Sequence, residues 1–220
     1  MDSSVPPPPA ARAARPSLRP WYLVAAMALT WFAGIHGLTT GCANAAFLRD
    51  GALPDVTTAA RNARGAWDLV DLVALLRAVE LQAMRLDARV TYPLAVAEAL
   101  LAGLLIVASG LAMTGRRGAR SLALQAIVAN AVLACVAYAA TRGMRAAWIE
   151  ALMRTAATLP IGVPQRDAFS NESFFWWASR LKLVVFDLGV LALGAFALTR
   201  ARTKAYFDAM ARVIESPEEP

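Results

Sequence analysis

The chain has 220 residues, of which 58% are hydrophobic and 17% are charged. Soluble domains average about 45–50% apolar and about 25% charged residues, so this composition argues against an ordinary soluble domain and favours a membrane protein. The net charge is +6. Because no basic run is interleaved with aromatic residues, we expect contact with anionic lipid headgroups and no nucleic-acid partner.

The chain opens with a proline- and arginine-rich tail, residues 1–20, which we expect to be disordered. Pro6 to Pro9 favour a polyproline II segment and cannot start a helix. An apolar block of residues 21–40 follows, about the length that a spanning helix needs. The sequence Ala43-Asn44-Ala45 resembles a signal-peptide cleavage site. The apolar run is longer than a usual signal peptide has, so we expect a span and keep cleavage as the alternative.

Three further apolar blocks predict three more spanning helices, over residues 92–113, 122–140 and 181–198. The second and third blocks are joined by a short turn that contains Arg116, Arg117 and Arg120, so they must form an antiparallel hairpin. We therefore predict an all-α fold, a polytopic integral membrane protein with four transmembrane helices and helical extensions outside the membrane. We expect residues 21–200 to form this one domain.

Cations are densest in the tail, in the short turn and after the fourth block, which places both termini and the turn in the cytoplasm. The alanine- and arginine-rich composition suggests a bacterial chain, so the predicted location is the cytoplasmic (inner) membrane. Four cations oppose this orientation, because they flank the other ends of the spans: Arg142, Arg145, Arg180 and Lys182.

The outer segments, residues 49–90 and 142–178, carry helical patterns of their own. Apolar residues in the first alternate at spacings of three and four, which is a heptad seam. The seam residues are Leu69, Leu72, Leu76, Val79, Ala83, Leu86 and Val90. We expect this seam to pack on the 145–159 segment or on a partner. Pro93 should kink or break the chain before the second span, and Asn171 should cap the helix that leads into the fourth.

The cytoplasmic juxtamembrane tail, residues 201–220, places Phe207, Met210 and Ile214 on one helical face. This pattern predicts a short helix lying on the inner leaflet.

Ionisable residues inside spans are costly and therefore the default site candidates. His36, Glu98 and Asp187 fall at similar depth, with Lys182 nearby. They could form a polar pocket for an ion, a cationic ligand or protons, or they could simply fix helix packing, which the sequence favours. Lys182 and Asp187 are five residues apart, about 140° around an α-helix, so they should not share a face. A single histidine and two cysteines, Cys42 and Cys135, leave no metal-site or catalytic motif, so we predict no metal, cofactor or catalytic residue.

The favoured function is an interaction or assembly subunit that uses the outer heptad helix, with the lipid bilayer and a membrane protein or a second copy as partners. One alternative is an oligomeric transport or channel component with a polar site in the outer third of the bilayer. The other is a membrane sensor or enzyme subunit, although the sequence favours a non-enzyme. Convergence of His36, Glu98, Asp187 and Lys182 around a cavity would support the alternatives.

Overall fold

The computed structural model describes residues 19–52, 69–116, 118–157 and 171–215, and within them it contains helices and no strands. Four helical rods are long and apolar enough to cross a membrane. They are α1 (Trp21–Asp50), α4 (Ala88–Thr114), α5 (Ala119–Ala140) and a composite rod of α8 (Glu172–Leu181), the π-helix η1 (Lys182–Leu188) and α9 (Gly189–Thr199). The predicted all-helical class and the four apolar helices are confirmed.

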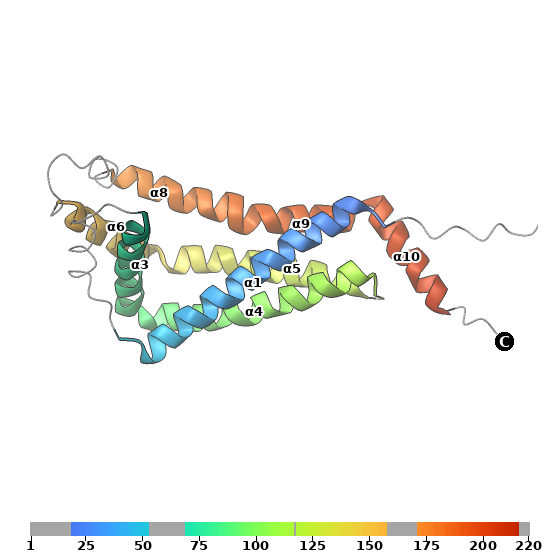
Figure 1. Cartoon of the computed structure of the whole chain (residues 1–220), viewed down its shortest axis with the longest axis horizontal. Coiled ribbons are helices and arrows are strands. Elements are labelled where there is room, and N and C mark those ends of the chain that lie inside the picture. The colour runs from blue at the N-terminus through green and yellow to red at the C-terminus, as the bar shows by residue number, and fades with distance from the viewer. Residues whose placement is uncertain (1–18, 53–68, 117, 158–170, 216–220) are drawn as a thin grey trace, which may run out of the picture.

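The four rods run lengthwise as an antiparallel bundle (Figure 1). At one end α3 (Leu69–Leu86) lies across the bundle, and α6 (Arg142–Ala157) continues from α5. We call α3, α6 and α8 together the cap. At the other end α10 (Ala201–Glu215) turns off the last rod. The start of α1, the α4–α5 turn and α10 therefore lie at the same end of the bundle, opposite the cap.

Small residues set the packing inside the bundle, where α1 and α4 form the most extensive helix pair. A Cβ placed on Gly41 would lie 2.8 Å from the backbone nitrogen of Ala99 and 2.9 Å from the carbonyl oxygen of Ala95. The α1 and α4 backbones thus approach each other more closely than any side chain would allow. This is how helices pack when little but van der Waals contact holds them together.

The predicted hairpin between the second and third spans is present. Gly115 and Gly118 flank its tip with φ of 71° and 75°, in the left-handed region where glycine has no steric penalty. Arg120 donates from Nε to the carbonyl oxygen of Leu198 at 2.9 Å. The turn is thereby tied to the end of α9, whose last carbonyls have no partner within their own helix.

The tail helix α10 exists as predicted, but its apolar face packs against the end of the bundle. Tyr206 and Phe207 are buried in the bundle core, with Met210 beside them. Thr203 is also buried and donates to the carbonyl oxygen of Ala197 at 2.7 Å. The side chain of Ile214 lies outside the described residues. The face that was expected on the inner leaflet is thus used for tertiary packing in residues 203–210.

The cap has a hydrophobic core of its own, separate from that of the bundle. Residues of α3, α6 and α8 bury one another there: Leu75, Val79, Ile149, Leu152 and Phe175. Asn171 caps α8, accepting from the backbone nitrogen of Phe174 at 3.2 Å, as its position predicts. The two outer segments therefore form helices that pack on each other, as expected.

Two helix boundaries differ from the prediction. α1 continues ten residues beyond the apolar block to Asp50, because Asn44 and Leu48 find buried positions against the cap side of the bundle. The break before the second span falls at Asp87, where the chain turns from α3 into α4. Pro93 lies inside α4 as its sixth residue, and the helix continues through it, so the predicted break at this proline is not found. Its missing backbone N–H removes one hydrogen bond within the helix.

Candidate functional site

The heptad seam of α3 is turned partly toward α6. Val79 and Ala83 are buried, and Leu76 packs against the cap core. Leu86 is 79% exposed, so within the chain the 145–159 segment does not cover it, and its burial by a partner stays a prediction. The side chains of Leu69 and Leu72 lie outside the described residues, and Val90 is half-buried at the start of α4.

The buried face of α3 does not coincide with the seam, because α1 and α4 also pack against this helix. Leu75 and Ala78, which are not seam residues, are buried, and Met84 packs with Leu48 and Ala95. A heptad pattern assumes a single partner helix, whereas α3 touches three. Most of its described apolar surface is therefore used inside the chain.

The four polar candidates lie near one another. The charge of Lys182 acts on both Glu98 and Asp187, and the charge of His36 acts on Asp187. Among the described residues no hydrogen bond or ion pair joins any two of the four. We call them the polar group.

The π-helix η1 explains why Lys182 and Asp187 act on each other. Hydrogen bonds in a π-helix join residues five apart, so residues five apart lie roughly above one another. Lys182 and Asp187 are the first and sixth residues of η1. The expected separation of about 140° is therefore wrong, because the local helix is not an α-helix.

The polar group is a set of neighbouring charges without a described enclosure. In the described ranges no three His, Cys, Asp or Glu side chains gather as metal ligands would, and the pocket below contains none of the four residues. His36 and Lys182 are exposed on the rods. A second polar contact joins α3 to α1, where Arg77 of α3 donates to Glu80 at 2.7 Å and to Asn44 of α1 at 2.5 Å.

Both cysteines are free and exposed, Cys42 on α1 and Cys135 on α5. Asn130 donates from Nδ2 to the carbonyl oxygen of Leu101 at 3.0 Å. This bond joins α5 to α4, the helix-bridging role expected for an amide inside a span.

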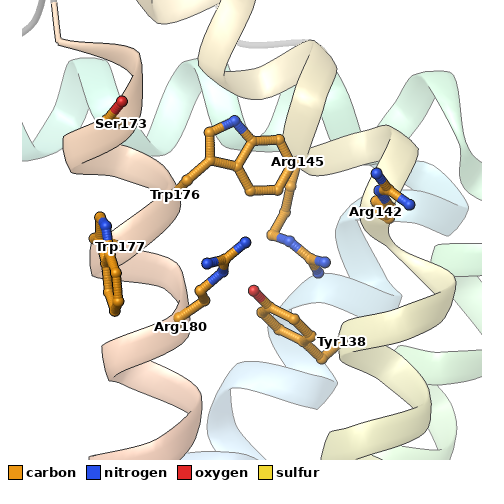
Figure 2. A pocket seen from close by; sticks show the side chains of 7 residues that line it. All are labelled: Tyr138, Arg142, Arg145, Ser173, Trp176, Trp177 and Arg180. Carbon is orange, nitrogen blue, oxygen red and sulfur yellow. The ribbon is translucent and has the colours of Figure 1, made fainter.

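A pocket of ≈ 580 Å³ opens between the α5–α6 junction and α8. Its lining combines three arginines with three large aromatic rings and includes no acidic residue. The lining residues are Tyr138, Arg142, Arg145, Ser173, Trp176, Trp177 and Arg180. The side chains of Arg145 and Arg180 both lie between the Trp176 and Tyr138 rings (Figure 2). The Arg145 guanidinium lies over Tyr138 and turns away from Arg180, and Arg142 points away from both.

Arg145 is the unusual member of this pocket. It is only 8% exposed, and its guanidinium lies 3.7 Å over the Tyr138 ring. Nη1 donates to the hydroxyl of Thr141 at 2.8 Å, but the buried Nε has no hydrogen-bond partner in the part of the chain that the structure describes. Burial lowers the pKa of the Arg145 guanidinium and the neighbouring Arg142 charge lowers it further, whereas Tyr138 raises it. An arginine in a protein nevertheless stays protonated.

The pocket carries uncompensated positive charge. No described carboxylate lies within 4 Å of any of its three guanidinium groups. Glu172 accepts from Nε1 of Trp176 at 3.2 Å, so it engages the indole and not an arginine. The arrangement can bind an anion with an apolar portion.

Reasoning from sequence did not bring these residues together. Arg145 and Arg180 come from two helices, α6 and α8, that are distant in the sequence, and no local pattern links them. The one available signal was the set of cations that opposed the predicted orientation. Three of those four, Arg142, Arg145 and Arg180, line the pocket.

No protein-family model, curated protein or solved structure matches this chain.

Proposed function

We propose that the chain is a multi-pass protein of the bacterial cytoplasmic membrane, with four spans and with the α10 end in the cytoplasm. The four apolar rods support the spans. Exposed cations gather around the end opposite the cap, as expected of a cytoplasmic face. They are Arg19, Arg116, Arg200, Arg202 and Lys204.

Cysteine labelling tests this orientation. In a chain with Cys42 and Cys135 changed to serine, we expect a membrane-impermeant maleimide to label Ala146→Cys in intact spheroplasts. It should label Ser121→Cys only after lysis. Ala146 lies exposed in the cap and Ser121 exposed near the opposite end, whereas the neighbouring Ala119 is buried and unsuitable. Labelling of Ser121→Cys from outside would reverse the orientation.

The role we propose is assembly, with a second copy of the chain as the partner, through the outer face of α4. Gly103, Val107 and Gly110 lie on one stripe of this helix. A Cβ on either glycine would meet nothing within 4 Å, and Val107 is 57% exposed. This open glycine pair is the observation that carries the proposal.

A glycine that faces lipid tails adds no stability there, because lipid tails contact large side chains equally well. Its recurrent use in spans is to let a second helix approach closely. The chain already uses it so on the other face of α4, where Gly34 and Gly41 of α1 are in close contact. The seam of α3 is less suitable as an interface, since α6 covers much of it. A symmetric dimer would bring the same stripe from both copies together.

Filling the stripe should separate the copies. We expect the double variant Gly103→Leu with Gly110→Leu to weaken self-association at least about tenfold, because the added side chains keep the backbones apart. Light scattering of the purified protein in detergent, across concentration, measures this. As a second readout, Val107→Cys in a background without native cysteines should form a disulfide-linked dimer on oxidation in membranes.

The matched control adds bulk to another exposed face. Val128 and Val132 are exposed on α5, so Val128→Leu with Val132→Leu should leave association unchanged, and Val132→Cys should not cross-link. A wild-type chain that is monomeric at all concentrations in both detergent and bilayers would contradict self-assembly. If the Val107→Cys chain instead cross-linked to a different membrane protein, this face of α4 would still be an interface, but its partner would not be a second copy.

A further inference from the structure

The pocket between α6 and α8 holds a buried arginine that pairs with no carboxylate of the described residues. Burying an ionised group without a partner is expensive, and proteins normally pair it. Arg145 stacks on Tyr138 and donates once to Thr141, and its Nε is left unsatisfied. Arg180, from α8, points into the same space. Two like charges thus line one pocket, where an anion could contact both.

The geometry defines the kind of anion. Guanidinium groups bind planar or tetrahedral oxyanions through paired N–H donors. Here Arg145 and Arg180 approach from two helices, so a group with several oxygens is needed to bridge them. The Trp176 and Tyr138 rings bound the same space (Figure 2), and they offer an apolar wall to whatever carries the charge.

We propose that this pocket binds a phosphate group through Arg145 and Arg180. The phosphate is carried by the headgroup of an anionic phospholipid or is free in solution. The lipid is the expected source, and that part rests on the proposed membrane insertion. Tyr138 lies near the cap end of α5, and Phe174, Trp177 and Leu181 are exposed on α8, as rings and apolar side chains are at the headgroup layer.

Thermal unfolding of the full chain in a non-ionic detergent tests the proposal. The probes are dioctanoyl phosphatidylglycerol, inorganic phosphate and dioctanoylglycerol, which lacks the phosphate. A ligand that binds only the folded chain raises its melting temperature with concentration. We expect phosphatidylglycerol to raise it saturably, and dioctanoylglycerol to leave it unchanged. Inorganic phosphate acting at the same concentrations as the lipid would support the free anion as the source.

Two variants assign the effect to the pocket. Arg180→Gln and Arg145→Gln should each raise the apparent Kd for the phosphate probe at least about tenfold, since each removes charge-assisted hydrogen bonds. Arg180 is exposed and donates no described hydrogen bond, so its variant should fold even if the Arg145 variant does not. Arg154→Gln is the control and should bind as the wild type does. Arg154 lies on α6 with Arg145 but is paired with Glu150.

Three results would overturn the proposal. They are no shift with either phosphate probe, an equal shift with dioctanoylglycerol, and unchanged affinity in Arg180→Gln. The inorganic phosphate arm needs no bilayer. A chain that fails the orientation test can therefore still pass here, which keeps the two proposals separable.

Discussion

A Gly41→Ala variant is expected to lose roughly 2 kcal/mol of stability, although alanine favours helices. The new methyl group would lie 2.8 Å and 2.9 Å from backbone atoms of Ala99 and Ala95, which cannot rotate away. α1 and α4 must therefore move apart along the most extensive helix pair of the bundle. Overpacking of this kind costs up to about 3 kcal/mol, and the helix-propensity gain of about 1 kcal/mol offsets only part of it.

Two other glycines give a graded comparison. A methyl group on Gly34 would lie 2.8 Å from Cγ1 of Ile106, but no closer than 3.1 Å to a backbone atom, so Gly34→Ala should cost less. Gly103 is open, so Gly103→Ala should be neutral or stabilising in the monomer. Melting temperatures of the three variants in one detergent should rank in this order, Gly41 lowest. Equal melting temperatures would show that the α1–α4 contact is looser than described.

Local signals allowed much of the fold to be predicted. Four apolar blocks gave four apolar helices, because length and composition alone decide whether a helix can span a bilayer. The Gly115–Gly118 turn and the Asn171 cap depend on the chemistry of a few adjacent residues, and both are present. The packing of the outer helices on each other followed from their apolar stripes.

Features that depend on a neighbouring helix were not predicted. α1 extends beyond its apolar block because Asn44 and Leu48 are buried by tertiary contacts. The face that α3 buries reflects contact with α1 and α4 as well as with α6. In η1 one change of hydrogen-bond register places Lys182 and Asp187 on the same side of the helix. A sequence pattern read with a fixed 3.6-residue period cannot show this.

The arginine pocket was missed for a similar reason. Its charged residues lie on α6 and α8, and only the folded cap brings them together. The rule that predicts orientation treats every cation near the end of a span as a marker of the cytoplasmic side. Cations at the opposite ends of the spans were therefore counted only as evidence against the predicted orientation, yet three of them share one pocket. Cations that oppose the orientation rule are candidates for anion sites.

The cap should open when a charge is placed in its core. Val79 is 1% exposed and packs with Leu75, Ile149, Leu152 and Phe175. We expect Val79→Asp to destabilise the cap by roughly 3–5 kcal/mol, the usual cost of an uncompensated buried charge. The bundle core consists of different residues, so its helices should remain folded. The effect is therefore expected as local unfolding of α3.

Limited trypsin digestion of the purified chain measures this opening. Arg77 and Arg85 lie on α3, and a loss of 3 kcal/mol raises the open population about a hundredfold. Cleavage at these two sites should accelerate by at least one to two orders of magnitude, while sites on α10 are cut at the wild-type rate. Val73→Asp is the matched control, since Val73 lies on the same helix but is 56% exposed, and its cleavage rate should stay near the wild-type value. If both variants were cut equally fast, the core formed by α3, α6 and α8 would not be what holds α3 on the bundle, and the packing of the seam on α6 would have to be abandoned.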